Sequence, residues 1–256
     1  MSSVEQARFA NKMPKKMRVD ELLVEKALCE TVEDARRYII AGQVRAGYDR
    51  VVQKSTEMLS LDNPLFLNLP SPYVSRGAYK LKPALEEFSS DCSGKVAIDL
   101  GSSTGGFTDL MLQNGCEKVF AVDVGTGQLH YKLRTDSRVI SLERTNARTL
   151  SDEQITEKVD LLTSDVSFIS VTKVLPSADK FMKKNALALI LVKPQFECPK
   201  HLVGDGIIRD EDLRKQMVEK VKSFCETELN WSFLKVFPSP LKGPKGNQEY
   251  VTVFRK

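Results

Sequence analysis

Residues 96–108 of the chain read VAIDLGSSTGGFT. The β-rich run Val96–Leu100 predicts a buried strand, and the apolar periodicity of Phe107–Asn114 predicts a helix. Between them lie three glycines, which allow tight turns and a close approach of the backbone to a ligand: Gly101, Gly105 and Gly106. The stretch therefore predicts a strand–turn–helix unit of an α/β sheet, with a ligand site at the carboxyl end of the strand.

The chain from residue 75 onward continues this alternation. Further strands are predicted at Val119–Val122, Val139–Leu142, Val159–Ser164, Ala186–Val192, Phe233–Phe237 and Tyr250–Phe254. Further helices are predicted at Tyr79–Phe88, Gln128–Arg134, Val171–Lys183 and Glu211–Leu229. The pattern is typical of a parallel, doubly wound α/β sheet. The loop Pro238–Gly246 leaves no room for a crossover helix, so the last strand should run antiparallel. A seven-stranded, mostly parallel sheet of this kind resembles the class I (Rossmann-like) methyltransferase fold.

A small α+β domain is predicted before it, at residues 14–62. Apolar residues at helical spacing from Val19 to Ala27 predict one helix, and Thr31–Asp34 resembles a capping box that starts a second. Gly42 ends the second helix, and a short hairpin is predicted between Val44 and Val52. Prolines then mark a linker at residues 63–74, followed by the larger domain at residues 75–256.

The net charge of +4 is a local property of the N-terminus. Residues 1–18 contain five basic residues against Glu5, and the rest of the chain is balanced; the five are Arg8, Lys12, Lys15, Lys16 and Arg18. A basic arm fits contact with phosphates. A solubilising arm without a partner explains the charge equally well at this point.

Cysteine usage and hydropathy restrict the class of protein. The five cysteines are scattered without a CxxC pair, and the two histidines lack cysteines at zinc-ligand spacing. No apolar run approaches the roughly 18–20 residues of a membrane helix, and no secretory signal is visible. We therefore expect a reduced, cytoplasmic protein without a structural metal and without stable membrane association.

Two acids accompany the glycine-rich turn. Asp99 lies two residues before Gly101, where a carboxylate can balance the ammonium group of S-adenosylmethionine, and the dehydrogenase fingerprint GxGxxG is absent. Asp123 ends the next strand, where a carboxylate can accept hydrogen bonds from ribose hydroxyls. Together they predict a nucleoside cofactor, although a structural turn and a solvated strand end remain the alternatives.

Four further segments lie at the same predicted crevice. They are Ser75–Leu81, Thr163–Phe168, Leu191–Glu197 and Gly246–Tyr250. Lys193 follows a wholly apolar strand, which is an unfavourable place for a cation without a partner or a function. Ordinary surface ion pairs are the alternative for each charged residue taken alone.

The chain resembles the TlyA family of ribosomal RNA methyltransferases, historically called hemolysin A, and the segments that carry the likeness are Ser75–Leu81, Gly101–Thr108, Glu143–Arg148, Ser167–Ser170 and Lys193–Glu197. The likeness extends from Arg18 to the end of the chain, and the larger domain also resembles FtsJ-type ribose methyltransferases. It implies the catalytic set Lys80, Asp165, Lys193 and Glu249. It also implies that the N-terminal module is an α-L RNA-binding domain of the type found in ribosomal protein S-four. Some relatives carry a tryptophan where Tyr73 stands here.

The chemistry of these residue types fits ribose methylation. A 2'-hydroxyl must lose its proton to attack a sulfonium methyl group, and Lys193 is the predicted base. Asp165 and Glu249 would orient the lysines, and Lys80 would help to stabilise the developing alkoxide. Because the methyl donor is already activated, no metal is required.

The predicted cofactor residues surround the glycine-rich turn. They are Asp99, Gly101, Ser103, Thr104, Gly105, Gly106, Phe107, Asp123, Val124, Asn146, Ala147 and Asp165. Asn146 is expected to face the adenine, with Ala147 beside it. Phe107 either stacks on the cofactor or belongs to the core, and the core is the simpler use.

Basic residues of the N-terminal module predict an RNA surface. With one residue of the larger domain they are Lys15, Lys16, Arg18, Lys26, Arg36, Arg37, Arg45 and Arg76. Such contacts position RNA without reading its sequence, and they make binding sensitive to salt. A solvated basic face is the alternative.

The sequence thus predicts 2'-O-methylation of ribosomal RNA, with a cytidine in 16S or 23S RNA, or both, implied by the resemblance. The partners would be ribosomal RNA and ribosomal subunits, with the oligomeric state left open. A membrane-active hemolysin, an NAD-dependent oxidoreductase and a catalytically silent RNA-binding protein are the alternatives.

Overall fold

A computed structural model describes residues 15–47, 50–68, 71–243 and 245–256. The chain forms two compact units, residues 1–70 and 71–256, and each is described by itself. Arg8 and Lys12 of the predicted basic arm lie outside the described residues. No helix among the residues described is long and apolar enough to cross a membrane.

The larger unit contains a seven-stranded sheet in the order β11-β12-β10-β9-β6-β7-β8. The five strands from β10 to β8 are mutually parallel, whereas β12 runs antiparallel to both of its neighbours. This confirms the predicted class I methyltransferase fold and its antiparallel last strand. The strand bounds are β6 Val96–Leu100, β7 Lys118–Val122, β8 Val139–Leu142, β9 Val159–Ser164, β10 Met182–Val192, β11 Ser232–Pro238 and β12 Tyr250–Arg255.

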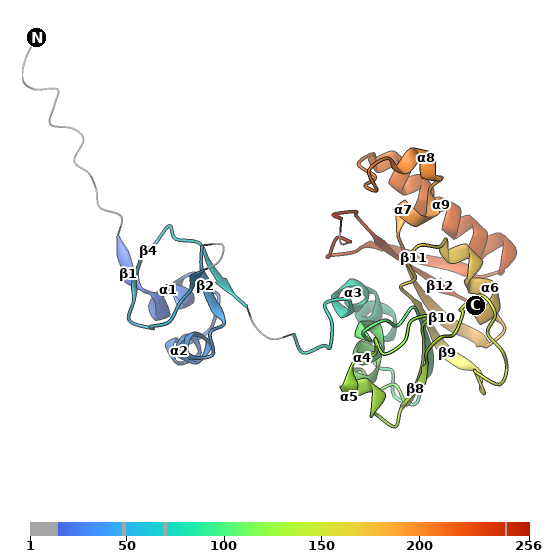
Figure 1. Cartoon of the computed structure of the whole chain (residues 1–256), viewed down its shortest axis with the longest axis horizontal. Helices are drawn as coiled ribbons and strands as arrows, with labels where there is room; N and C mark the ends of the chain where they lie inside the picture. Colours follow the sequence, from blue (N-terminus) through green and yellow to red (C-terminus); the bar gives the residue numbers. More distant parts are fainter. Residues whose placement is uncertain (1–14, 48–49, 69–70, 244) are drawn as a thin grey trace, which may run out of the picture. The chain divides into compact units, whose positions relative to one another are not determined.

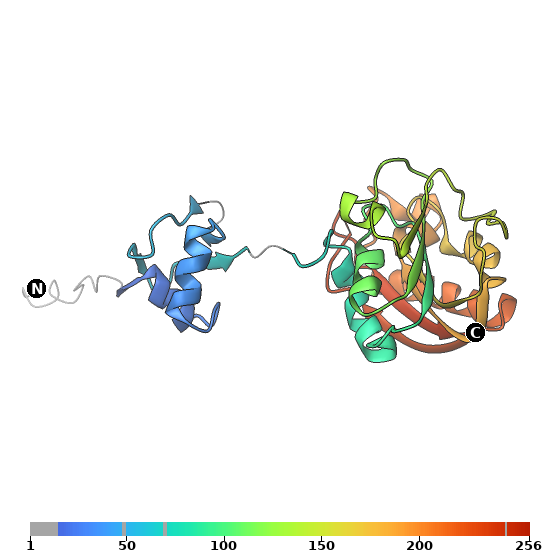
Figure 2. The same cartoon turned by 90° about the horizontal axis from the view of Figure 1, so that it is seen from below.

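Helices cover both faces of the sheet (Figures 1 and 2). On one face lie α3 (Ala78–Ser89), α4 (Gly106–Gln113) and α5 (Tyr131–Arg134), and on the other lie the 3-10 turn η1 (Val171–Lys173), α6 (Leu175–Asp179) and α9 (Glu211–Glu228). Alternate residues of the central strands therefore enter two separate cores: Ile98 packs in one and Ala97 in the other. Burial on both faces explains why β6 is buried along its whole length.

Two of the predicted helices are shorter than expected. The predicted helix Val171–Lys183 is wrong beyond Asp179, because Met182 already pairs with Val159 and strand β10 begins there. Asn185, with a φ of +65°, lies where the register of β10 shifts. The predicted helix Gln128–Arg134 is reduced to α5, whose N-terminus is capped by His130. Two short helices after β10 were not predicted: α7 (Pro194–Glu197) and α8 (Lys200–Val203).

The smaller unit contains the two predicted helices and the predicted hairpin, with strands that the sequence did not indicate. Its elements are β1 Lys16–Arg18, α1 Val19–Glu25, α2 Val32–Ile40, β2 Val44–Ala46, β3 Arg50–Val51, β4 Met58–Ser60 and β5 Leu65–Leu67. Thr31 caps α2 as expected. Strand β5 pairs with β2, so residues 65–67 belong to this sheet and their assignment to the linker was wrong. Leu65 is buried in the core of the smaller unit, so strand β5 belongs to that unit.

Candidate active site

The glycine-rich turn is shaped by what packs against it. Gly101 has a φ of +77°, and a Cβ there would lie 3.0 Å from the backbone carbonyl of Asp165. Gly105, with a φ of +95°, faces Leu133. A Cβ on Gly106 would lie 2.6 Å from the Ser75 hydroxyl. Because these glycines have no side chains, three other chain segments can pack at the carboxyl end of β6. The same lack of side chains lets a ligand approach the backbone closely.

Two adjoining cavities open at this end of the sheet and share Gly101, Ser103, Asp165 and Ser167. The larger, of about 520 Å³, also contains four of the predicted cofactor residues: Asp123, Val124, Asn146 and Ala147. The smaller, of about 240 Å³, is lined by four other predicted cofactor residues: Asp99, Thr104, Gly106 and Phe107. It is also lined by both predicted catalytic lysines, Lys80 and Lys193. The structure therefore brings most of the predicted cofactor and catalytic residues to one crevice. Gly105 and Glu249 line neither cavity, because Gly105 faces Leu133 and Glu249 is paired with Lys80. Phe107 is also part of the core, in agreement with the simpler prediction.

The acids at the strand ends organise the crevice in different ways. Asp123 accepts hydrogen bonds from the backbone N–H of Ser103 (2.8 Å) and of Gly125 (2.7 Å), which ties the turn to the end of β7. Asn146 accepts one from the N–H of Arg148 at 3.0 Å, and its side-chain NH₂ can serve as a donor in the larger cavity.

Asp99 is fully buried, and its carboxylate accepts hydrogen bonds from the hydroxyls of Thr108 (2.7 Å) and Thr163 (2.9 Å). Burial raises the pKa of Asp99 to about 6, and the two threonine hydrogen bonds oppose that rise. The carboxylate thus links strand β6 to strand β9 and to helix α4. Its expected pairing with the ammonium group of a cofactor has to compete with these contacts.

The four predicted catalytic residues form two ion pairs. Lys80 Nζ lies 2.6 Å from Glu249 Oε2, and Lys193 Nζ lies 2.6 Å from Asp165 Oδ1. Gln195 also donates to Glu249, at 3.3 Å. Glu249 and Lys193 have side chains only 1% and 8% exposed, so neither pair is a surface contact. Buried charges of this kind are tolerated only when they are paired, and the pairing holds two cations beside the smaller cavity.

Two residues of the segment Thr163–Phe168, which the sequence placed at this crevice, were given no role from the sequence. Ser167 accepts a hydrogen bond from Lys193 Nζ at 2.7 Å. Phe168 is 91% exposed, lies at the larger cavity with a φ of +64°, and its ring centroid is 5.1 Å from that of Phe196. A bulky residue in the left-handed region is strained, and an exposed aromatic face beside this cavity suits stacking on a nucleobase. Their position directly after Asp165 was the available signal.

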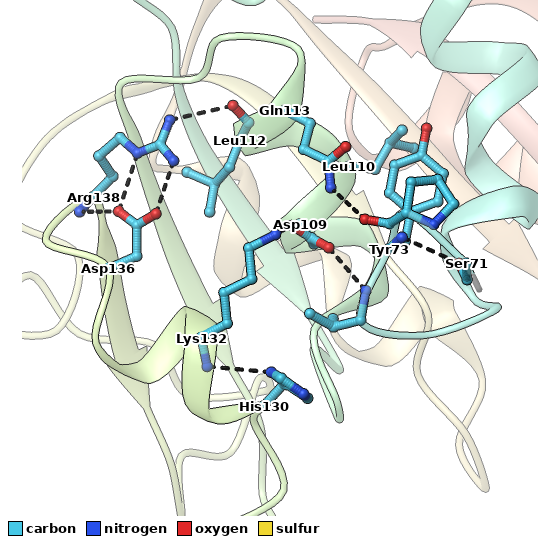
Figure 3. A network of polar contacts seen from close by, with 12 residues as sticks. Ser71, Tyr73, Asp109, Leu110, Leu112, Gln113, His130, Lys132, Asp136 and Arg138 are labelled. Carbon is cyan, nitrogen blue, oxygen red and sulfur yellow. Dashed lines mark hydrogen bonds and ion pairs between the residues drawn. The ribbon is translucent and has the colours of Figure 1, made fainter. Parts of the chain in front are cut away.

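The segment that enters this unit is anchored to helix α4 (Figure 3). The buried carboxylate of Asp109 accepts hydrogen bonds from the N–H of Val74 (2.8 Å) and from Lys132 Nζ (2.9 Å). Gln113 donates to the carbonyl of Pro72 at 2.9 Å. Residues 71–74, predicted as linker, are therefore tied to the helix that starts at the glycine-rich turn.

The predicted RNA-contact residues are distributed over both units. Arg18 and Arg36 both bind the buried Asp20, at 2.7 and 3.0 Å, and Arg37 binds Asp34. Lys15 and Lys16 are exposed, Lys26 and Arg45 are half-buried, and Arg76 is exposed just before α3 in the larger unit. Whether they form one RNA surface stays a prediction. In the described part of the chain, no three His, Cys, Asp or Glu side chains are grouped to hold a metal ion.

Comparison with known proteins bears on this geometry. A family model described as FtsJ-like methyltransferase matches residues 73–256. The 16S/23S rRNA (cytidine-2'-O)-methyltransferase TlyA of Mycobacterium tuberculosis is 42% identical over 240 residues, which are 93% of this chain and 89% of that protein. Hemolysin A of Brachyspira hyodysenteriae is 38% identical over 245 residues, 93% of this chain and 99% of that protein.

A solved structure agrees with these relatives. A hemolysin-type protein from Streptococcus thermophilus superposes with a TM-score of 0.72 at 39% identity, covering 95% of this chain and 89% of that one. The matches extend over both units of the chain. The chain therefore belongs to the TlyA family of FtsJ-like methyltransferases.

Proposed function

We propose that this chain transfers a methyl group from S-adenosylmethionine to a ribose 2'-hydroxyl of ribosomal RNA. The observation that carries the proposal is the pair of ion pairs, Lys80–Glu249 and Lys193–Asp165, whose lysines line the smaller of two adjoining cavities. Asp123 and Asn146 line the larger cavity. The two ion pairs suit deprotonation of an alcohol, and the side chains of Asp123 and Asn146 suit the binding of a nucleoside. NAD-dependent chemistry gains nothing from two lysines at this position.

The residues present fit the cofactor. Asp123 retains carboxylate lone pairs for ribose hydroxyls, Asn146 and Ala147 lie beside the same cavity for an adenine, and Gly101 keeps the floor between the two cavities free of a side chain. When bound, S-adenosylmethionine supplies a methyl group activated by a positively charged sulfur.

The ion pairs suggest separate roles for the two lysines. In its neutral form Lys193 accepts the proton of the 2'-hydroxyl at Nζ, while Asp165 and Ser167 hold that atom in place. Lys80, held by Glu249, contributes a positive charge near the oxygen that becomes negative. Alignment of the hydroxyl in the crevice supplies much of the remaining acceleration, and no step needs a metal.

The target is inferred from the relatives and from the predicted RNA surface. The Mycobacterium tuberculosis relative is named for cytidines of 16S and 23S RNA, and we propose a cytidine in one or both of these RNAs here. Ribosomal subunits are the proposed partners. The basic residues of the smaller unit and Arg76 would contact RNA phosphates, and exposed Phe168 would stack on the target base.

Methyl transfer to ribosomal subunits tests the proposal. Purified protein and tritiated S-adenosylmethionine are incubated with 30S and 50S subunits that lack the modification, and the RNA is digested to nucleosides. We expect label in 2'-O-methylcytidine. Label in a base-methylated nucleoside, or no label in either subunit while the cofactor binds, would refute the proposal.

A further inference from the structure

The loop that follows β9 is held at both ends by one short segment after β10. At its start, Asp165 and Ser167 contact Lys193 Nζ, at 2.6 and 2.7 Å. At its end, Glu197 Oε1 accepts a hydrogen bond from the N–H of Val171 at 2.7 Å, and Glu197 Oε2 accepts one from the Ser170 hydroxyl. The proposed base and Glu197 thus bracket the same loop, residues 165–171.

Glu197 is an unusual residue for this position. The residue is only 4% exposed, and burial raises the pKa of its carboxyl group. Lys220 Nζ donates to the backbone carbonyl of Glu197 at 2.7 Å and leaves the carboxylate to the loop. A buried carboxylate is destabilising, and an apolar side chain would fill the same space without the desolvation penalty. The hydrogen bonds that Glu197 makes with the loop are therefore the reason to expect an acid, and not an apolar residue, at this position.

The loop needs such a contact. Val171 begins η1, so its N–H has no partner within that turn. Phe168, in the middle of the loop, has a φ of +64°, an unfavourable conformation for a residue other than glycine that persists only when surrounding contacts impose it. Without the hydrogen bonds at Ser170 and Val171, the loop would relax away from this conformation.

We infer that Glu197 is a positioning residue for methyl transfer, which keeps the loop 165–171 where Asp165 and Ser167 can hold Lys193 Nζ. The inference rests on the proposed function and assigns Glu197 no contact with substrate or cofactor. It predicts that Glu197 acts on turnover through Lys193 and leaves cofactor affinity largely unchanged.

Three variants separate this role from a general effect on folding. Glu197→Ala removes both hydrogen bonds. Glu197→Gln keeps the shape, because its carbonyl can accept from Val171 and its NH₂ can donate to the Ser170 hydroxyl. Ser170→Ala removes the hydrogen bond to Glu197, and one with the Thr172 hydroxyl at 2.8 Å, without altering Glu197. Glu219→Ala, on the exposed face of α9 and paired with Lys222, is the matched control.

The readouts are kcat on ribosomal subunits and the Kd for S-adenosylmethionine. We expect Glu197→Ala to lower kcat by roughly tenfold to a hundredfold and Ser170→Ala by a smaller factor, with the Kd within about twofold. Glu197→Gln should recover most of the activity. If Glu197→Ala does not fold, Ser170→Ala and Glu197→Gln decide the question. Wild-type kcat in a folded Glu197→Ala or in Ser170→Ala, or a Glu197→Gln as impaired as Ala, would overturn the inference.

A double-mutant cycle tests whether the effect passes through the Lys193 contacts. Ser167→Ala removes the hydroxyl that Lys193 binds. If Glu197 and Ser170 act through that contact, Ser167→Ala combined with Ser170→Ala should have the kcat of the worse single variant, whereas independent effects would multiply and overturn the inference. Failure of wild-type protein to methylate RNA refutes the proposed function itself, which is a different result from active wild type with unimpaired variants.

Discussion

The two units bury acids beside cations in opposite ways. In the smaller unit, the fully buried Asp20 holds Arg18 and Arg36, and the Arg36 side chain is 47% exposed. In the larger unit, Asp165 holds Lys193, and the Lys193 side chain is only 8% exposed. An acid that faces outward-pointing arginines presents positive charge to a large polyanion. A lysine withdrawn beside a cavity is available to a single reacting group. The difference agrees with the proposed division of labour, in which the smaller unit binds RNA and the larger unit carries out the chemistry.

Replacing Lys193, the buried cation of the larger unit, should have the largest effect. Lys193→Ala removes the proposed base, and general-base catalysis contributes on the order of 10²- to 10⁴-fold. We expect kcat for methyl transfer to fall by roughly a thousandfold, with RNA binding unchanged. Lys222→Ala, which alters an exposed pair on α9, is the control. Loss of RNA binding in Lys193→Ala would contradict the division between the units.

A buried acid without a cation should show itself in the pH dependence of stability. Because the pKa of Asp99 is raised to about 6, the folded state binds this proton more tightly than the unfolded chain, so stability falls as pH rises from about 4 to about 6. The charge then costs about 3 kcal/mol at higher pH. In Asp99→Asn, the side chain can still bond both threonines. Its free energy of unfolding should exceed that of the wild type at pH ~8 and match it near pH ~4. A difference independent of pH would contradict this account.

A third buried acid resembles Asp20 and predicts a smaller effect. Asp109 holds the half-exposed Lys132 and the N–H of Val74. Asp109→Ala leaves that N–H without its partner and should cost about 1–3 kcal/mol of unfolding free energy. Asp109→Asn keeps an acceptor for Val74 and loses only a partly exposed ion pair, so its cost should be under about 1 kcal/mol. Equal losses in thermal or denaturant unfolding would show that the ion pair, and not the anchoring of residues 71–74, matters.

Replacing one outward cation should have the smallest effect. Arg36→Ala leaves Asp20 paired with Arg18, so the fold is kept. We expect RNA affinity to weaken a few-fold, and the slope of log K against log salt to become shallower by just under one for each phosphate that the variant no longer neutralises. Methylation at saturating RNA should be unchanged. Glu33→Ala on the same helix, which removes an acid, is the control. If the slope of log K against log salt is unchanged, Arg36 is not part of the RNA-binding surface.

Much of the fold was predictable because its signals are local. The run Val96–Leu100 and the glycines after it specify a strand and a turn without reference to distant residues. The helix Val171–Lys183 was predicted too long for the same reason: its local pattern is compatible with a helix, and only the pairing of Met182 with Val159 turns its end into a strand. Strand β5 was missed because three residues carry too little periodicity, and pairing with β2 decides it.

The candidate site, like the fold, was predictable only in part. The sequence pattern placed the ends of the parallel strands, with Asp165 and Lys193, at one edge of the sheet. The resemblance to FtsJ-type enzymes implied the full set Lys80, Asp165, Lys193 and Glu249. The sequence did not specify which acid pairs with which lysine. Lys80 pairs with Glu249 across 169 positions, and the carboxylate of Asp99 is taken up by two threonines of other elements. The contact of Ser167 with Lys193, and those of Glu197 with the loop 165–171, could not be predicted from the sequence either. Residue type and order are sufficient to predict which chemistry is present. Burial and distance, which arise only when remote segments pack together, decide which charge pairs with which and therefore what each residue can do.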